Sequence, residues 1–458
     1  MTSPARGSTA APVRTAARTV GALALLQLAL PANAALTGAA LVRGAFRGRR
    51  SAPRSATTPG AASVTSAAPR TVMVSGGKMT KALQLCRSFH AAGHRVVLVE
   101  SAKYAMTGHR FSRSVSSFHV VPRPEEAGYA QALLDVVVSE GVDVYVPVCS
   151  PVSSYHDALA REVLALYCEV VHADAATIAA LDDKERFAGL ALSLGLPVPQ
   201  SHRITDPDEV AGFDFSSTGR DYIHKSIPYD PVHRLDLTLL PRESVAATRS
   251  FAESKPMSRD NPWVMQEFVA GQEYCTHGTA RNGRVQVYCA CESSAFQVNY
   301  ASVDIPEIED WVTTFVGALG LTGQFSFDFM RTPDGQVYAI ECNPRTHSAI
   351  TLFDGHPGFA AAYLEDDRPV IRPLPSSRPT YWLYHELWRV LAHPTTAPQR
   401  WRVVRAGRDA IFDWDDPVPF FVVHHVQIPW LLLQNLRRGR GWLRIDFNIG
   451  KLVEPAGD

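Results

Sequence analysis

Hydrophobic and polar positions alternate with two different periods in the first part of the chain. Between Arg70 and about residue 180, short apolar runs are separated by stretches with helical spacing. The predicted strands are Thr71–Val74, Arg95–Glu100 and Val142–Val148, and the predicted helices are Lys81–Ala92 and Tyr129–Glu140. Strands that alternate with helices favour a parallel sheet covered on both faces, so we expect a Rossmann-like domain here.

The order of elements changes near Leu181. A helix is predicted from Asp182-Asp183-Lys184 to about Leu194, where Gly195 ends it. Strands follow without intervening crossover helices, and a helix then precedes a hairpin. The expected strands are Tyr222–Ser226, Trp263–Phe268, Tyr274–Ala280 and Val285–Cys291, and the expected helix is Glu307–Leu319. This is the α+β order of a second domain.

Both ends of the chain differ from these domains. Residues 20–42 carry no charge and are flanked by arginines, which suits a membrane-anchoring helix with the body on the cytoplasmic side. A dispensable amphipathic leader is the alternative. Residues 50–70 have the composition of a linker. The apolar run at 417–433 fits a core helix and an interfacial membrane helix equally. We therefore expect four segments, 1–70, 71–180, 181–365 and 366–458.

Overall composition excludes some classes of protein. The 458 residues are 46% hydrophobic, which is enough for two or three domains with their own cores. The formal net charge is zero, so nothing indicates nucleic-acid binding. The seven cysteines form no CxxC pair, which is typical of reduced thiols in a reducing compartment.

Candidate chemistry is concentrated in the predicted hairpin. Alternation along Gln324–Met330 places Ser326 and Asp328 on one face and three phenylalanines on the other. A two- or four-residue turn around Asp334-Gly335 would bring Asp328 opposite Glu341. We prefer the four-residue turn because Pro333 has no N–H to close the tighter one. A three-residue turn with a glycine bulge would split the pair across the sheet.

Facing carboxylates repel each other, and a divalent cation removes the repulsion. Asn343 follows on the same face and adds a neutral oxygen. Mg²⁺ prefers oxygen ligands and commonly takes one or two carboxylates together with substrate phosphates, so we predict magnesium at Asp328, Glu341 and Asn343, with Mn²⁺ as a substitute. The alternative is a surface hairpin with scattered acids.

Further polar residues upstream suit a nucleotide. Lys184 begins a helix, and Lys225 interrupts an apolar strand, where a polyphosphate would supply the missing anion. A lysine that snorkels from a strand end is the alternative. The strand that ends in Gln266, Glu267, Phe268 and Val269 could read an adenine edge through its backbone, and Glu273 could bind ribose hydroxyls.

Taken in order, these residues resemble the ATP-grasp superfamily between about Arg70 and Glu365. The resemblance implies an ATP-grasp architecture in which Lys184 and Lys225 bind phosphates and Lys225 also acts in catalysis. It implies that residues 266–269 contact adenine, that Glu273 binds ribose, and that Arg345 stabilises developing negative charge. ATP and Mg²⁺ are then the expected cofactors, and an ADP-forming ligase that makes a C–N bond is the expected enzyme.

Longer stretches resemble the ATP-grasp ligases of mycosporine-like amino acid biosynthesis. These stretches are 74–85, 143–152, 340–351 and 445–454. The resemblance implies that an enol oxygen of 4-deoxygadusol is phosphorylated and then replaced by the amine of glycine. A carboxylate–amine ligase acting on amino acids and a non-catalytic, membrane-anchored nucleotide-binding regulator are the alternatives.

Two loops depart from common nucleotide-binding patterns. Ser75-Gly76-Gly77-Lys78 follows a strand, but Val72 and Met79 occupy positions where a P-loop needs glycine and serine or threonine. We reject a P-loop, although free N–H groups there could hold an anion. The segment after Lys225 has no glycine, and its phosphate contact would come from Arg234.

Overall fold

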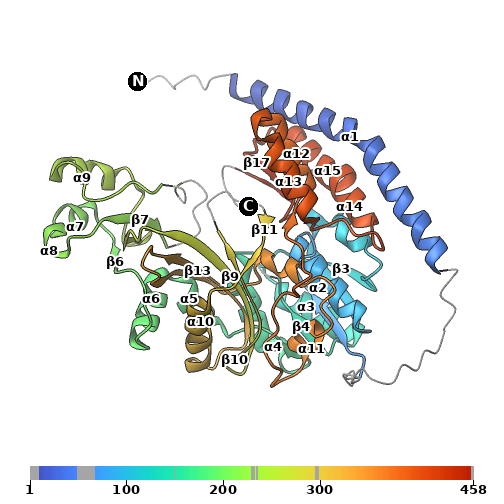
Figure 1. The fold of residues 1–458 in the computed structure, drawn as a ribbon, viewed down its shortest axis with the longest axis horizontal. Helices are drawn as coiled ribbons and strands as arrows, with labels where there is room; N and C mark the ends of the chain where they lie inside the picture. The colour runs from blue at the N-terminus through green and yellow to red at the C-terminus, as the bar shows by residue number, and fades with distance from the viewer. Residues whose placement is uncertain are drawn as a thin grey trace.

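The computed structural model describes residues 10–48, 68–148, 150–227, 233, 236–293 and 299–454. Most of the predicted linker at 50–70, and Arg234, lie outside these ranges. A parallel-sheet domain, an antiparallel-sheet domain with a small three-stranded sheet beside it, and a helical C-terminal extension make up the chain (Figure 1). The long N-terminal helix runs along the C-terminal extension (Figure 1).

The first domain contains the predicted parallel sheet, in the strand order β3-β2-β1-β4-β5. Its strands are β1 (Thr71–Val74), β2 (Arg95–Ser101), β3 (Ser117–Val121), β4 (Val144–Val146) and β5 (Glu169–Val170). Its helices are α2 (Thr80–Ala91), α3 (Tyr129–Glu140) and α4 (Ser153–Leu164). Val72, Met73 and Val74 are fully buried, because helices cover both faces of the central strand. The sequence pattern missed the two edge strands, β3 and β5, which are partly exposed or very short.

The second domain is built on an antiparallel sheet in the order β12-β10-β9-β13-β14. These strands are β9 (Gln272–Arg281), β10 (Arg284–Glu292), β12 (Ser302–Val303), β13 (Gly323–Arg331) and β14 (Val337–Asn343). Phe325, Phe327 and Phe329 of β13 are buried against Trp311 and Phe315 of α10 (Pro306–Ala318). Packing aromatic rings behind alternate positions of β13 turns the intervening positions, Ser326 and Asp328, to the opposite face.

A smaller antiparallel sheet, β6-β8-β7, completes this domain. Its strands are β6 (Ser201–Ile204), β7 (Tyr222–Ser226) and β8 (Trp263–Glu267). The helices around the two sheets are α5 (Ala175–Asp182), α6 (Lys184–Ser193), α7 (Pro207–Ala211), α8 (Phe215–Thr218) and α9 (Val245–Glu253). Its core cluster includes Tyr222, Trp263 and Met265, so this unit has its own hydrophobic centre.

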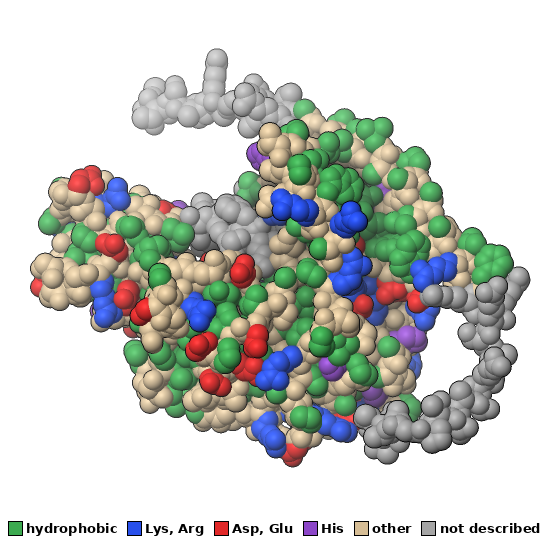
Figure 2. Space-filling view, viewed as in Figure 1, with side chains coloured by type: hydrophobic (Ala, Val, Ile, Leu, Met, Phe, Trp, Pro, Cys, Tyr) green, Lys and Arg blue, Asp and Glu red, His purple; other side chains and the backbone are tan. Residues whose placement is uncertain are grey.

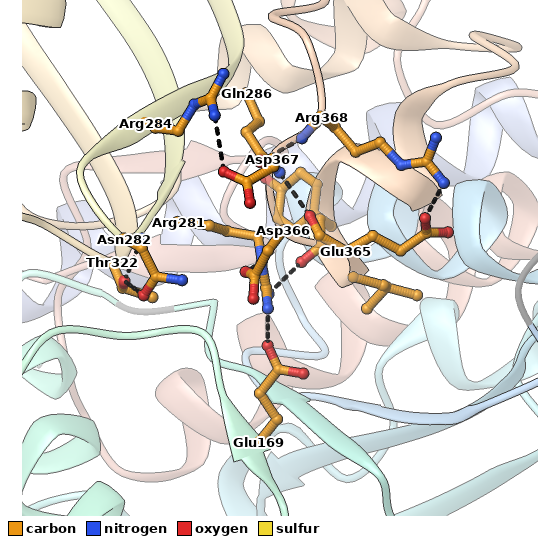
Figure 3. Close-up of polar contacts among 12 residues, drawn as sticks. Glu169, Arg281, Asn282, Arg284, Gln286, Thr322, Glu365, Asp366, Asp367 and Arg368 are labelled. Carbon is orange, nitrogen blue, oxygen red and sulfur yellow. Dashed lines mark hydrogen bonds and ion pairs between the residues drawn. The ribbon is translucent and has the colours of Figure 1, made fainter.

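A buried polar network joins the two sheet domains. The guanidinium of Arg281, at the end of β9, pairs with Glu169 of β5 and with Asp366 at 2.7 Å, and it donates to the carbonyl of Tyr363 at 2.9 Å (Figure 3). Gln286 donates to the carbonyls of Ala362 and Glu365 beside it. Arg281 has two carboxylate partners, so loss of either one leaves its buried guanidinium paired with the other. The network therefore resists sliding of one domain against the other.

The C-terminal extension is mostly helical. It follows η3 (Ser348–Phe353) and α11 (Phe359–Leu364) and contains α12 (Leu383–Ala392), α13 (Ala397–Ala406), α14 (Val418–Val422), the π-helical turn η5 (Val423–Gln427) and α15 (Ile428–Arg437). Short strands pair as β11-β15-β16 and β17-β18: β11 (Asn299–Tyr300), β15 (Thr380–Tyr381), β16 (Arg408–Asp409), β17 (Arg444–Asp446) and β18 (Lys451–Val453). The apolar run at 417–433 is thus broken into three helical pieces, two of which bury Phe420 and Leu432 in the main core.

The N-terminal apolar segment forms one helix, α1 (Ala10–Gly48). Its stretch Ala16–Phe46 is long and apolar enough to cross a membrane by length and composition, and 17% of its most apolar window is buried. The helix packs against α14, η5 and α15. Pro31 lies inside it without ending it.

Candidate functional site

The register of the β13–β14 pair brings the two acids together by a route that differs from our prediction. The turn has three residues, Pro333 to Gly335, because the Thr332 N–H donates to the Gln336 carbonyl at 2.9 Å and Gly335 takes a positive φ of 90°. The predicted four-residue turn is therefore wrong. A bulge at Ile340 adds one residue to β14 and shifts the register back, so that Asp328 pairs with Glu341.

The carboxylates are bridged by Asn343, which comes from the same strand as Glu341. The Asn343 amide nitrogen donates to Asp328 Oδ2 at 3.1 Å and to Glu341 Oε1 at 3.3 Å. Burial and the neighbouring charge of Glu341 raise the pKa of Asp328 well above its usual range. Burial alone would raise the pKa of Glu341 as well, but Lys184 and Lys225 outweigh it and hold that pKa below its usual value.

Two lysines from different elements face the acid pair. Lys184 Nζ, at the start of α6, lies 3.4 Å from Glu341 Oε2. Asp183 caps that helix by accepting from the N–H groups of Glu185 and Arg186, which fixes where Lys184 begins. Lys225 comes from β7 in the small sheet, and its pKa is lowered chiefly by burial, against the attraction of Glu341. Among the described residues no ion pair or hydrogen bond engages the Lys225 ammonium, so it has capacity for an anionic ligand.

Arg345 closes the site on the side of α5. Its guanidinium donates to the amide oxygen of Asn343 and lies 3.3 Å from Asp182 Oδ1. Burial raises the pKa of Asp182, and Arg345 counteracts this effect. Sequence reasoning missed Asp182 as a site residue, although it is the first residue of the Asp182-Asp183-Lys184 helix signal.

The Gln266 side chain is bound to the hairpin. Its buried side-chain amide donates to the carbonyl of Ile340 at 3.1 Å, and Ile340 is the bulge residue of β14. The amide ties β8 to the bulge, and the assignment of residue 266 to the adenine hinge, which concerns its backbone, stays a prediction. Gln266 thereby supports the position of Glu341, one residue further on.

The other residues of the predicted hinge, 267–269, differ in whether their backbone N–H groups are already bonded. The N–H groups of Glu267 and Phe268 are already bonded, to the carbonyls of Gln200 and Asp221 at 2.8 Å each. The Glu267 carboxylate pairs with Arg220 at 2.7 Å. Within the described ranges, the Val269 N–H makes no backbone hydrogen bond, and it can donate to a ligand.

Glu273 lies near the acid pair on the neighbouring strand β9. It is paired with Met330 across β9 and β13, two positions from Asp328. Its carboxylate accepts from Ser293 Oγ at 2.8 Å, and its charge acts on both Asp328 and Lys225. Ser293 is a further residue that sequence reasoning missed, since no local pattern links it to Glu273.

Four N–H groups in the loop after β1 and at the start of α2 are bonded within the protein. The N–H groups of Gly77, Lys78, Met79 and Thr80 donate to the Val99 carbonyl, the Glu100 carboxylate, the Gly76 carbonyl and the Asn448 carbonyl. These four groups are therefore not free to hold an anion. The bond from Thr80 to Asn448 shows that the C-terminal tail covers this helix end.

The donor chemistry of the site fits a magnesium ion with one rearrangement. Two carboxylates and an amide oxygen are the ligands that the ion prefers. In the structure, however, the Asn343 oxygen is taken by Arg345 and the amide nitrogen is turned toward the acids. Binding a cation through all three groups requires the amide to rotate by half a turn and Arg345 to release it.

Comparisons with known proteins report on the fold. No family model matches the chain, and no curated protein matches it in sequence. The structure resembles an ADP complex of PurK, an N5-carboxyaminoimidazole ribonucleotide synthetase, with a TM-score of 0.51, 13% identity and coverage of 68% of this chain and 80% of that one. It also resembles a biotin carboxylase–β-γ-ATP complex from Campylobacter jejuni, with a TM-score of 0.52, 13% identity and coverage of 64% and 70%. The chain therefore has the predicted ATP-grasp fold, with a parallel-sheet domain and an N-terminal apolar helix.

Proposed function

We propose that this ATP-grasp chain is an ATP-dependent, ADP-forming ligase. The observation that carries the proposal is the placement of Asp328 directly opposite Glu341, with Asn343 between them and Lys184 at 3.4 Å. A repulsive acid pair held within reach of two lysines suits a metal-bound polyphosphate better than a structural role. Solved structures of the same fold hold ADP and an ATP ligand, which supports a nucleotide in this one.

Each residue then has a role that follows from its contacts. Asp328, Glu341 and Asn343 would hold Mg²⁺, which when bound offsets the charge of the β- and γ-phosphates. Lys184 and Lys225 neutralise the remaining phosphate charge from two sides. Phosphoryl transfer depends mainly on such positioning and electrostatic stabilisation.

In this proposal, residues of the hinge (266–269) and of β9 determine which nucleotide binds. The free N–H of Val269 donates to the adenine edge, and Glu273, oriented by Ser293, accepts from the ribose hydroxyls. Gln266 acts indirectly, by fixing the bulge that aims Glu341.

Arg345 supplies positive charge where the transferred phosphoryl group meets its acceptor. It starts out bound to Asn343 and Asp182. If the Asn343 oxygen held a cation, Arg345 would lose this partner and its guanidinium would be able to pair with phosphate charge. An amine then displaces phosphate from the activated acceptor, and a C–N bond forms.

For the substrates, we propose 4-deoxygadusol and glycine, giving mycosporine-glycine, ADP and phosphate. The support is the resemblance of residues 74–85, 143–152, 340–351 and 445–454 to ligases of that chemistry. A carboxylate–amine ligase acting on amino acids is the second candidate, and the same acid pair would serve it.

Two measurements test the proposal in order. Calorimetric titration of the full chain with the non-hydrolysable analogue AMP-PNP, with and without Mg²⁺, should show metal-dependent binding; equal weak binding in both would refute the nucleotide site. Phosphate release is then measured with 4-deoxygadusol plus glycine and, separately, with pairs of amino acids. A new ultraviolet-absorbing product in the first mixture supports the substrate assignment, while release only with amino-acid pairs supports the second candidate.

A further inference from the structure

The long helix α1 has an unusual distribution of polar residues. The residues that it buries against the protein lie three, four or seven positions apart, on one face of the helix: Thr19, Leu26, Asn33, Thr37 and Ala40. Three of these five side chains are polar. A helix on the surface of a protein in water normally buries apolar side chains and exposes polar ones.

The buried polar side chains of α1 have specific partners in the C-terminal extension. Trp442 Nε1 donates to Thr19 Oγ1 at 2.9 Å, and Asn33 Nδ2 donates to the Tyr384 hydroxyl at 3.1 Å. Thr37 donates to Asn33 Oδ1 at 3.2 Å. These bonds fix the rotation of α1 about its axis, because turning the helix would leave buried polar groups unpaired.

The outward face of α1 is consequently apolar. No charged residue occurs between Arg18 and Arg43. Leu28 is 78% exposed, Phe46 63% and Val42 57%. We call the exposed large apolar side chains of the helix the α1 surface; they are Val20, Leu25, Leu28, Leu41, Val42 and Phe46. Figure 2 shows apolar side chains along the length of this helix and over the neighbouring C-terminal helices.

The contacts between α1 and the C-terminal extension limit the orientations that the helix can take in a membrane. Near one end, Arg18 stacks on Trp442 at 4.1 Å from the ring centroid, and near the other, Arg43 lies over Trp414 at 5.2 Å. These two contacts are about 37 Å apart along the helix, at 1.5 Å per residue, which exceeds a hydrocarbon core of about 30 Å. A spanning α1 would therefore have to drag the C-terminal extension into the bilayer.

The helix α1 and its helical neighbours carry charge of one sign only. Residues 1–99 and residues 417–445, which together include α1 and its helical neighbours α14, η5 and α15, contain no Asp or Glu. Beside α1, α15 exposes Trp430, Leu433 and Leu436, and it ends in the exposed pair Arg437 and Arg438. Apolar and tryptophan side chains bordered by arginines suit the interface of an anionic bilayer.

We propose that the α1 surface lies in the plane of an anionic membrane leaflet, as an interfacial helix rather than a spanning one. The outward leucines, valines and phenylalanine enter the boundary between headgroups and acyl chains. The inward polar residues keep the helix bound to the C-terminal extension, and the flanking arginines contact lipid phosphates. This attachment is independent of the nucleotide chemistry, so either proposal can fail without the other.

Flotation of the full-length protein with vesicles tests the proposal. We expect the protein to float with vesicles of phosphatidylcholine and 30% phosphatidylglycerol, and to float at least about tenfold less when Leu28→Asp and Val42→Asp are combined, since two inserted apolar side chains are lost. Leu166→Asp is the matched control, because Leu166 is 80% exposed on the parallel-sheet domain. That variant should float like the unaltered protein.

A depth measurement distinguishes the in-plane helix from a spanning one. A fluorophore is attached in turn at Val20→Cys, Leu28→Cys and Val42→Cys and is quenched by lipids that carry a label at known depths. Equal shallow depth at all three positions is the expected result, while a maximum at residue 28 would establish a span and overturn the proposal. Absence of vesicle binding by the unaltered protein would also overturn the proposal. So would an unaltered protein that binds no lipid but self-associates, if combining Leu28→Asp and Val42→Asp abolishes the self-association.

Discussion

Asp328 and Glu341 face each other across β13 and β14 although an odd-numbered turn joins the two strands. The three-residue turn alone would place them on opposite faces of the sheet, and the extra residue Ile340 compensates. The acid pair therefore depends on a bulge, and the bulge carbonyl is held by Gln266 from a different sheet. The proposed nucleotide chemistry should therefore depend on the contact between the two sheets.

Replacing Glu341 with alanine should reduce turnover by at least about 10³-fold, because a metal ligand that positions the phosphates is lost. The fold should remain, since Glu341 is only partly buried at the sheet end. Steady-state phosphate release and circular dichroism give the two readouts. Asp310→Ala, at an exposed position on α10, is the control and should retain full activity. Near-normal turnover of the Glu341 variant would disprove the metal assignment.

Gln266→Met should impair the site without touching a ligand. The variant keeps the side-chain volume but leaves the Ile340 carbonyl without its donor, so the bulge loosens and Glu341 moves. We expect metal-dependent AMP-PNP affinity to fall about tenfold, which corresponds to about 1.4 kcal/mol. Gln399→Met, at an exposed position on α13, is the matched control. If affinity changes equally in both variants, the coupling through Ile340 is refuted.

Arg345→Met should separate catalysis from binding. The guanidinium is needed when negative charge develops, and it competes with a cation for the Asn343 oxygen in the resting site. We therefore expect kcat to fall at least about 100-fold, while the Mg²⁺ concentration that supports half-maximal AMP-PNP binding stays equal or decreases. A variant that loses nucleotide binding in proportion to kcat would contradict this role.

Acidification should destabilise the small sheet through His224. Burial, reinforced by the charge of Lys255, lowers the pKa of His224 to about 4. Above pH 6.5 the residue is neutral in both the folded and the unfolded state. Between about pH 6.5 and pH 4 only the unfolded state gains the proton, so stability falls by up to about 1.4 kcal/mol per pH unit.

Hydrogen exchange of peptides from β7 and β8 measures this effect. Protection should decrease as the pH falls through that window, after correction for the intrinsic exchange rate. His224→Phe, which can stack on Phe251 as His224 does, should flatten the dependence. The exposed His90→Phe serves as the control and should leave the pH profile unchanged.

Gly450→Ala should detach the C-terminal tail. Gly450 has a φ of +68°, and an added Cβ would lie 2.2 Å from the Lys78 carbonyl oxygen. Gly439 has a similar φ of +62° but open space around it, so Gly439→Ala reports the backbone strain alone. We expect Gly439→Ala to cost about 1 kcal/mol and Gly450→Ala at least about 2 kcal/mol more, measured by urea unfolding and by proteolysis of the tail. Equal costs would show that the contact with Lys78 is unimportant.

Local pattern determined much of this protein. The alternation of polar and apolar residues correctly placed Asp328 on one face of β13 and the phenylalanines on the other. The alternation of strands with helices correctly predicted the parallel sheet. Both patterns depend only on residues that are close in sequence. Helix signals likewise placed Lys184 at the start of α6.

Tertiary structure decided the rest. The carbonyl of the bulge residue Ile340 is held by a hydrogen bond from Gln266, 74 residues away in sequence. The free donors expected after β1 are taken by distant groups, including the Asn448 carbonyl. The apolar face of α1 points outward because Thr19 and Asn33 find partners in the C-terminal extension. Such choices depend on which polar groups meet when the chain folds, and local spacing does not contain that information.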